Sequence, residues 1–227
     1  MSIVIDDTLL AGREATFGAG GSEPYAHALG REGRLTLVGS SRTGVDYDLG
    51  RWMAEADDVD RALLASETGP VLDIGCGPGR MVQAATDLGL VALGVDVSKA
   101  AVRVAGRAGL PVLNRSVFDR LPREGHWGTM LLIDGNIGIG GDPRAMLERC
   151  RELLGRRGAA IVEVQSDDDV DETFMAHVVD DDGRSSSSFP WAELGTRALE
   201  RHAAAAGFDL EQTWRVDGRT FCRLVCR

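Results

Sequence analysis

One ten-residue stretch constrains the fold more than any other part of the chain: VLDIGCGPGR, at residues 71–80. An apolar run ends in an acid, three glycines then alternate with other residues, and a helix-compatible stretch follows at 80–88. Glycine lets the backbone turn sharply and approach a ligand closely. The first N–H groups of the following helix, and its positive dipole end, point at whatever binds there. The stretch therefore predicts a strand–loop–helix unit that binds a nucleotide-like ligand.

Strand-like and helix-like patterns alternate after this stretch. Most of the strand-like segments are continuous apolar runs, which is typical of a parallel sheet covered by helices on both faces. We expect strands at 71–75, 90–96, 111–118, 128–134 and 159–165, and helices at 80–88, 98–108 and 142–154.

The end of the chain follows a different pattern. A helix is expected at 191–206, and two strand-like runs at 208–216 and 219–226 are joined by Asp217-Gly218. Asp-Gly between two such runs is a strong signal for a β-hairpin. We therefore predict an α/β fold with a seven-stranded, doubly wound sheet that is mostly parallel and ends in an antiparallel C-terminal hairpin.

Two segments fall outside this pattern. Residues 1–47 are glycine-rich, broken by an apolar run at 35–38, and we expect an N-terminal cap or flexible segment there. A helix is expected over 48–64, which would open the main domain at 48–227. The polar insertion at 166–190 is either a solvated loop or a hairpin that turns at Asp182-Gly183 and covers the site.

Composition excludes several classes of protein. The 227 residues carry a net charge of −10, which argues against a nucleic-acid surface because phosphate backbones require clustered Lys and Arg. The four cysteines lack the spacing of a metal site or a disulfide framework, so we expect no metal and a reducing compartment. With no leader-like N-terminus and no apolar run of about 18 residues, we expect a cytoplasmic protein without a membrane partner.

The spacing of the glycines in this loop distinguishes between two classes of ligand. The dinucleotide fingerprint is Gly-x-Gly-x-x-Gly, whereas Gly75, Gly77 and Gly79 form Gly-x-Gly-x-Gly. A buried carboxylate at Asp73 would repel a pyrophosphate and would suit a cationic ligand. S-adenosylmethionine carries a sulfonium and an ammonium group and no phosphate. The loop therefore favours this methyl donor over a dinucleotide, which remains the alternative.

Residues 71–80 resemble the first motif of the class I S-adenosylmethionine-dependent methyltransferases, and the resemblance extends over 48–227, including the final hairpin. It implies that Asp73, Gly75, Cys76, Gly77 and Gly79 hold the donor. Asp96 lies 23 residues after Asp73, at the end of the second strand. In this family an acid there binds both ribose hydroxyls, and the next residue, Val97, would pack on the adenine.

The third expected strand would complete the adenine site. The resemblance implies that Val117 and Phe118 form its apolar wall. Many members carry an acid where this chain has Ser116, so either Ser116 or Asp119 is expected to bind the adenine amino group.

The segment after the fourth strand, DGNIGIGGDP at 134–143, would border the transferred methyl group. It lacks the Asn/Asp-Pro-Pro-aromatic tetrad of the nucleic-acid amino-methyltransferases and the two glutamates of the protein-arginine enzymes. It is closer to the loops of small-molecule methyltransferases. Asp134 and Asn136 are therefore candidate catalytic residues, with Asp134 also facing the donor; the alternative is turn chemistry and capping of the helix that begins at residue 142.

Methyl transfer to oxygen or nitrogen can require a general base. Of the four histidines, His27 and His177 lie in segments that could reach the site. Tyr25, Tyr47 and Arg51 lie where N-terminal elements of such enzymes often cover the donor, and Arg51 could pair with its carboxylate.

The sequence thus predicts an S-adenosylmethionine-dependent enzyme that methylates an oxygen or nitrogen atom of a small-molecule acceptor. The alternative is an accessory protein of the same fold that binds the donor without transferring its methyl group.

Overall fold

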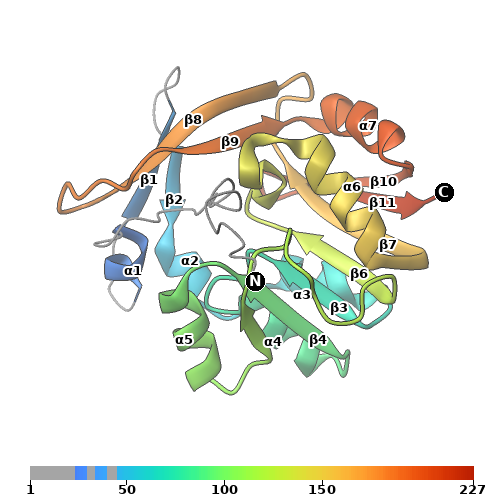
Figure 1. The fold of residues 1–227 in the computed structure, drawn as a ribbon, viewed down its shortest axis with the longest axis horizontal. Helices are drawn as coiled ribbons and strands as arrows, with labels where there is room; N and C mark the ends of the chain where they lie inside the picture. The colour runs from blue at the N-terminus through green and yellow to red at the C-terminus, as the bar shows by residue number, and fades with distance from the viewer. Residues whose placement is uncertain (1–23, 30–33, 40–44) are drawn as a thin grey trace, which may run out of the picture.

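A computed structural model of the chain describes residues 24–29, 34–39 and 45–227, and its centre is a seven-stranded sheet (Figure 1). The strand order is β10–β11–β7–β6–β3–β4–β5. The strands are β3 (Val71–Ile74), β4 (Ala92–Asp96), β5 (Val112–Asn114), β6 (Trp127–Leu132), β7 (Leu154–Val164), β10 (Phe208–Val216) and β11 (Arg219–Cys226). Strands β3 to β7 pair in parallel, and β11 is antiparallel to both β7 and β10. The predicted fold class and C-terminal hairpin are confirmed.

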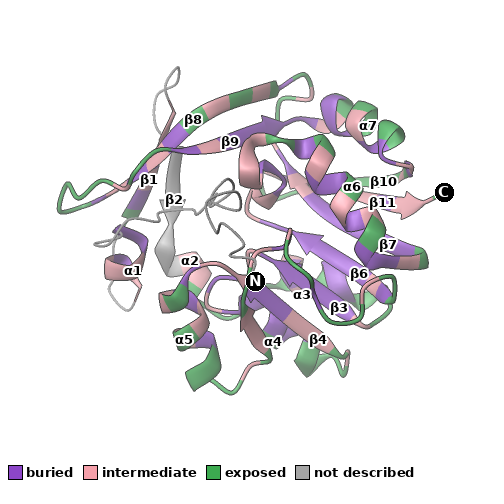
Figure 2. Cartoon of the chain, viewed as in Figure 1, coloured by how far each residue is buried: buried purple, intermediate pink, exposed green. Residues whose placement is uncertain are grey.

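Helices cover both faces of this sheet because its strands alternate two apolar faces. Val71 packs in one cluster with α3 (Asp58–Ala65) and α4 (Arg80–Asp87). Leu72 packs in another with α6 (Pro143–Leu153) and α7 (Thr196–Ala205). Helix α5 (Lys99–Arg107) follows β4 and precedes β5. Figure 2 shows the central strands as the most continuously buried part of the molecule.

A second sheet joins the N-terminal segment to the insertion. Its order is β2 (Val45–Asp48), β1 (Arg34–Gly39), β8 (Asp171–Asp180) and β9 (Phe189–Leu194), all antiparallel. In Figure 1 it lies beside the central sheet, with α1 (Pro24–Ala28) and α2 (Leu49–Met53) next to it. Leu37 of β1 packs against Val178 and Trp191 of the hairpin. Two segments more than a hundred residues apart thus form one layer.

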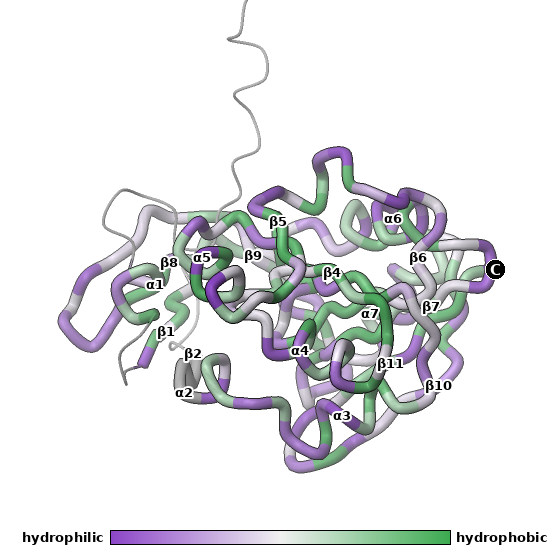
Figure 3. The backbone as a smooth tube through the Cα atoms, turned by 90° about the horizontal axis from the view of Figure 1, so that it is seen from below, coloured by the Kyte–Doolittle hydropathy of each residue, from purple (hydrophilic) through white to green (hydrophobic). Residues whose placement is uncertain are grey.

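The insertion is a hairpin rather than a solvated loop. Its turn lies where the Asp182-Gly183 pair predicted it, since Gly183 has φ +78° and donates its N–H to the carbonyl of Asp180 at 2.9 Å. Figure 3 shows hydrophilic colouring at the tip of this hairpin. The hairpin extends past the predicted end of the insertion at residue 190, because β9 continues to Leu194.

The helix expected over 191–206 is wrong in its first part. Residues up to Leu194 belong to β9, where Trp191 pairs with Phe174 of β8, and the helix begins only at Thr196. The run Trp191-Ala192-Glu193-Leu194 fits either structure locally. The partner strand β8 decides it.

The observed ends of two other elements also differ from the predicted ones. The strand expected at 111–118 ends at Asn114, because Ser116 and Asp119 close a turn in which Asp119 donates its N–H to the Ser116 carbonyl at 3.1 Å. The helix expected over 48–64 is two helices, α2 and α3. Asp57 lies between the two helices in an extended conformation. Its carboxylate caps the start of α3 by accepting the N–H of Asp60 at 2.8 Å.

Much of the predicted cap at residues 1–47 lies outside the described residues, so the division at residue 47 stays a prediction. Among the helices that the structure describes, none is long and apolar enough to cross a membrane.

Candidate functional site

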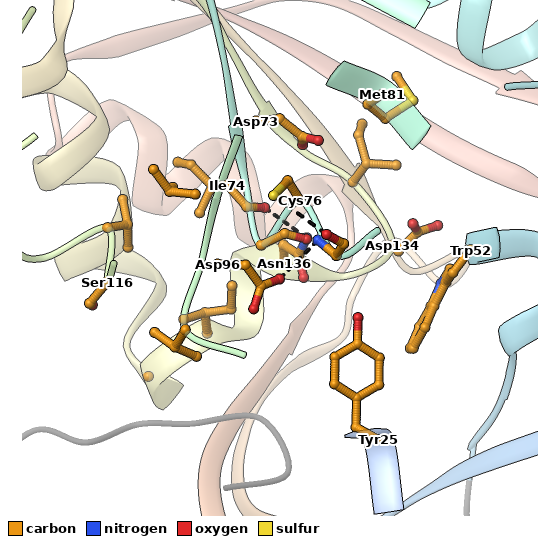
Figure 4. A pocket seen from close by; sticks show the side chains of 18 of the residues that line it. Tyr25, Trp52, Asp73, Ile74, Cys76, Met81, Asp96, Ser116, Asp134 and Asn136 are labelled. Atoms are coloured by element: carbon orange, nitrogen blue, oxygen red, sulfur yellow. Dashed lines mark hydrogen bonds between the residues drawn. The ribbon is translucent and has the colours of Figure 1, made fainter. Parts of the chain in front are cut away.

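A pocket opens at the carboxyl ends of β3, β4 and β6 (Figure 4). Strand β3 has β4 on one side and β6 on the other, so successive strands are added to opposite sides of the sheet from this point. Ligands of open α/β sheets bind at such a topological switch point. The lining residues are Tyr25, Trp52, 73–78, Arg80, Met81, 95–97, 115–117, Ile133, Asp134, Asn136, Ile139, Gly140 and 189–191. Most of the residues predicted to hold the donor are among them.

The glycine loop requires its glycines. Gly75 and Gly79 have φ values of +67° and +96°, which side chains strongly disfavour. A Cβ on Gly75 would lie 2.8 Å from Nδ2 of Asn136, and one on Gly79 would lie 2.5 Å from Cδ1 of Leu110. Gly79 is the N-cap of α4 and lies outside the pocket lining, where a Cβ would clash with residues at and after the end of α5.

Asp96 lies against the same loop. Its Oδ2 accepts the N–H of Gly77 at 2.8 Å, and its Oδ1 accepts the N–H of Ser98 at 2.7 Å. The carboxylate is therefore fixed at the carboxyl end of β4, with Val97 beside it in the lining. Ser98 in turn caps α5, so the predicted ribose-binding acid is positioned by the start of a helix.

Asp73 is buried, with 3% of its surface exposed, and its carboxylate accepts no hydrogen bond from any residue that the structure describes. Burial raises its pKa to about 8; Arg80 opposes that rise, and Asp134 and Asp96 add to it. An isolated buried carboxyl group is costly unless a ligand completes it. A cationic group in the pocket would do so.

Residues after β5 form the far wall of the pocket. Ser116 and Val117 line it, as predicted for the adenine site, whereas Phe118 lies behind them, near Gly140. The Asp119 carboxylate accepts the N–H of Ser116 at 3.2 Å and lies outside the lining. Of the two candidates for binding the adenine amino group, the structure therefore places only Ser116 at the pocket.

Asp134 follows β6 in a left-handed backbone conformation, with φ +56°. Its N–H donates to Oε2 of Glu163 at 2.7 Å, and its Oδ2 accepts from Nη2 of Arg80 at 2.7 Å. Burial raises the pKa of Asp134, against an opposing effect of Arg80 and with a further contribution from Glu163. Strained backbone of this kind is common where a side chain must point into a site.

Sequence reasoning missed the ion pairs behind Asp134. Arg80 also pairs with Asp60, which is fully buried, and Arg219 donates to Asp60 at 3.1 Å and to Glu163 at 2.7 and 2.8 Å. One feature of the sequence could have indicated Glu163. Like Asp73, it is an acid near the end of an otherwise apolar strand.

Four aromatic side chains cover the pocket on the side of the second sheet. Tyr25 and Trp52 meet edge to face at 5.8 Å between ring centroids, and Phe189 and Trp191 do so at 6.0 Å. Figure 4 shows the Tyr25 hydroxyl pointing toward the glycine loop, and it lies 3.1 Å from where a Cβ of Gly77 would be. Residues of the N-terminal elements and of the hairpin thus line the same pocket.

A second cavity adjoins the first at the carboxyl ends of β6 and β7. It is lined by Arg51, Trp52, Asp134, Gly135, Ile137, 163–166, 191–194, Gly218 and Arg219. Three residues, Trp52, Asp134 and Trp191, line both cavities. A donor in the first cavity and a second molecule in the other would meet at these three side chains.

The structure places the remaining predicted residues as follows. Asn136 lines the donor pocket, but its amide donates to the carbonyls of Ile74 at 2.8 Å and Gly75 at 3.2 Å. Arg51 lies on the second cavity, with Nη2 at 3.3 Å from Oδ2 of Asp57. The side chain of Tyr47 lies outside the described part of the chain.

Neither candidate histidine lines a cavity described above. Nε2 of His27 lies 3.4 Å from Oδ2 of Asp182 in the hairpin turn. His177 is half-buried on β8 between the fully buried Ala176 and Val178. Side chains alternate along a strand, so His177 points to the other face of the second sheet from these two residues.

The residues present fit S-adenosylmethionine. The glycine loop, with left-handed backbone at Gly75 and Gly77, lies beside the Asp96 carboxylate. The buried Asp73 carboxyl accepts no hydrogen bond from the described residues, and an ammonium group would complete it. A dinucleotide would instead bring a pyrophosphate against these acids.

Comparison with known proteins agrees with this geometry. A family model described as a methyltransferase domain matches residues 49–213. A search of the curated proteins gives no significant match.

The fold is shared with many solved structures. A methyltransferase from Bacteroides fragilis, in complex with S-adenosyl-L-homocysteine, is 20% identical with a TM-score of 0.74, over 90% of this chain and 93% of that one. A 1,6-didemethyltoxoflavin-N1-methyltransferase from Burkholderia thailandensis is 20% identical with a TM-score of 0.56, over 78% and 82%. A sugar N-methyltransferase from a Streptoalloteichus species is 18% identical with a TM-score of 0.56, over 84% and 98%.

The family model covers most of the described chain, including most of the residues that line the pocket. The chain therefore belongs to the methyltransferase-domain family and is a class I S-adenosylmethionine-dependent methyltransferase.

Proposed function

We propose that this enzyme methylates an oxygen or nitrogen atom of a small-molecule acceptor, which binds in the second cavity. One observation carries the proposal: Asp134, Trp52 and Trp191 line both cavities, so the two sites meet at a single junction. Adjacent sites allow two reactants to be held in line, and this orientation is a large part of catalysis in a group transfer.

The donor pocket supplies binding and orientation. When bound, S-adenosylmethionine supplies a methyl group on a positively charged sulfur atom. The Asp73 carboxylate would pair with its ammonium group, and Asp96 would accept hydrogen bonds from the ribose hydroxyls. Val97, Ser116 and Val117 would hold the adenine. Gly75, Cys76, Gly77 and Gly79 shape the loop that these groups share.

Asp134 would act on the acceptor. Its side chain is 24% exposed, at the junction of the cavities, and Arg80 fixes its orientation. A carboxylate so placed can accept a hydrogen bond from an acceptor O–H or N–H group, orient it, and take its proton. Burial raises its pKa and so increases its basicity, while Arg80 limits the increase.

The aromatic cover would exclude water from the junction. Tyr25 and Trp191 are 4% and 3% exposed and belong to different segments of the second sheet layer. On this basis we propose that the N-terminal segment, divided from the main domain near residue 47, and the insertion at 166–190 act as a joint cover of the catalytic domain.

The names of two similar structures support a small acceptor. One acts on 1,6-didemethyltoxoflavin and the other on a sugar. The acidic composition, with 35 Asp and Glu against 25 Lys and Arg, gives no support to a nucleic-acid substrate.

The test is turnover of labelled donor with fractions of a metabolite extract. We expect methyl incorporation into material below about 1 kDa together with release of S-adenosylhomocysteine. Asp134→Asn should lower turnover at least 100-fold while leaving S-adenosylhomocysteine affinity within about threefold. Incorporation only into protein or nucleic acid, or release without a methylated product, would exclude the small-molecule proposal.

A further inference from the structure

The ionised groups behind the second cavity are unequal in number. Four acids, Asp57, Asp60, Asp134 and Glu163, share three cations, Arg51, Arg80 and Arg219, in one continuous ion cluster. Nη2 of Arg80 is 2.7 Å from Asp134, and Nε of Arg219 is 2.7 Å from Glu163. Four carboxylates against three guanidinium groups leave one negative charge in excess when all seven are ionised.

A molecule in the second cavity would meet this excess negative charge mainly at one residue of the cluster. Of the acids in the cluster, Asp134 and Glu163 line the second cavity, with side chains 24% and 15% exposed, whereas Asp60 is 1% exposed and outside the lining. Glu163 is already engaged by the Asp134 N–H and by two nitrogens of Arg219. The negative charge therefore faces a bound molecule mainly through Asp134.

The arginines on this wall are engaged by acids. Nε, Nη1 and Nη2 of Arg219 each contact a carboxylate, and Nη1 and Nη2 of Arg80 do the same. Nη2 of Arg51 lies 3.3 Å from Asp57 and 3.8 Å from Asp60. A carboxylate or phosphate on the acceptor would have to compete with these pairs inside a cluster that is already net negative.

Two tryptophan residues line both cavities at the same junction. Trp52 comes from α2 and Trp191 from β9, and both line the two cavities that Asp134 also lines. The faces of tryptophan rings attract cations, and they do so more strongly when water is excluded. Trp191 is 3% exposed. Aromatic rings and an excess carboxylate together make a site for a positively charged group.

We propose that the acceptor is a primary or secondary amine, bound as its ammonium form by Asp134 between Trp52 and Trp191. The proposal rests on the proposed function, because it assumes that the second cavity holds the acceptor. It narrows the acceptor atom from oxygen or nitrogen to nitrogen.

An ammonium group has no lone pair, so its nitrogen must lose one proton before it can accept a methyl group. Asp134 takes that proton: the N–H bond breaks, its electron pair stays on nitrogen, and an O–H bond forms on the carboxylate. Water at the open side of the cavity then removes the proton and restores the carboxylate. The Asp134 pKa, raised by burial, brings this transfer closer to balance.

The test uses binding to the protein saturated with S-adenosylhomocysteine, with three probes of similar size. These are cyclohexylamine, cyclohexanol and cyclohexanecarboxylate at pH 7.5, measured by calorimetry and by quenching of tryptophan fluorescence. We expect cyclohexylamine to bind at least tenfold more tightly than cyclohexanol, and cyclohexanecarboxylate to show no measurable binding. Asp134→Asn should weaken cyclohexylamine at least tenfold and leave cyclohexanol within about threefold.

Two further variants make the result specific. Glu200→Gln removes one negative charge from the exposed side of α7 and should leave the preference for the amine unchanged. Trp52→Leu keeps every charge of the ion cluster and should still weaken cyclohexylamine more than cyclohexanol, which keeps the test valid if Asp134→Asn fails to fold.

The two proposals can fail separately. Cyclohexanol or the carboxylate binding as tightly as the amine, or no amine binding to the loaded protein, would overturn the amine proposal and leave the small-molecule function standing. Methyl incorporation only into macromolecules, in the turnover test above, would overturn the proposed function itself.

Discussion

The side chain of Asn136 occupies the space that a Cβ atom on Gly75 would need, and its Nδ2 donates to the Gly75 carbonyl at 3.2 Å. The same amide donates to the Ile74 carbonyl at 2.8 Å. The loop after β6 therefore holds the loop after β3 in shape. A residue that the sequence suggested for catalysis is engaged in supporting the donor site.

Asn136→Ala should weaken binding of S-adenosylhomocysteine. The change removes two hydrogen bonds worth about 0.5–1.5 kcal/mol each and leaves space beside the glycine loop. We expect a loss of about tenfold in affinity by calorimetry. Gln83→Ala, on the exposed side of α4, is the control and should bind normally. Normal affinity in Asn136→Ala would show that the loop holds its shape without this side chain.

Asp96→Ala should reduce S-adenosylhomocysteine affinity at least 100-fold. The carboxylate would bind two ribose hydroxyls, and hydrogen bonds to charged groups contribute about 1.5–3 kcal/mol each. Because the same carboxylate holds the Gly77 and Ser98 N–H groups, a fall in melting temperature should accompany the loss. Asp87→Ala, an exposed acid on α4, provides the comparison. An affinity within threefold of the parent protein would remove Asp96 from the donor site.

Asp73 should make the ligand-free protein less stable as pH rises. Its folded-state pKa of about 8 lies above its ordinary value of 3.8, so between these two values the folded chain holds a proton that the unfolded chain has lost. That contribution to stability is complete below about pH 4 and declines through pH 8. Asp73→Asn cannot titrate there, so the stability of the parent protein relative to this variant should fall between pH 5 and 8 in chemical denaturation.

The same carboxyl should release a proton when ligand binds below pH 8, because an ammonium in the pocket favours the ionised form. Calorimetry at pH 7 in two buffers of different ionisation enthalpy should detect this proton release in the parent protein and a smaller one in Asp73→Asn. Equal proton release in both would show that Asp73 is already ionised before the ligand binds.

Asp60→Ala should destabilise the fold by about 3–5 kcal/mol, since it leaves Arg80 and Arg219 without a carboxylate that is fully buried. Urea denaturation measures this loss. Asp58→Ala removes an exposed acid from the first turn of the same helix and should cost less than about 1 kcal/mol. A similar small cost for both would mean that the ion cluster re-forms around Asp134 and Glu163.

Local patterns in the sequence were sufficient for the central sheet and for most of the donor pocket. The apolar run at 71–74, the glycine spacing after it and the Asp217-Gly218 turn each encode a structure through neighbouring residues. Asp73 and Asp96 could be assigned to one site because parallel strands place their carboxyl ends at the same edge.

Residues distant in the sequence could not be brought together in this way. The segment at 191–194 has no local preference that separates strand from helix, and its pairing with β8 decided it. Asp60 and Arg219 are separated by 159 positions, and no periodicity connects them. The alternation of buried residues in β1 and β8 is visible only after the two strands pair.

The sequence by itself determined the cofactor class, because the backbone conformation of the glycine loop and the acids beside it depend on local residue types. Only the tertiary structure decided which side chains line the two cavities. The second sheet, the aromatic cover and the ion cluster behind Asp134 all come from long-range pairing. The free energy that stabilises these features comes from burial and charge contacts between distant segments. No single segment makes these contacts by itself.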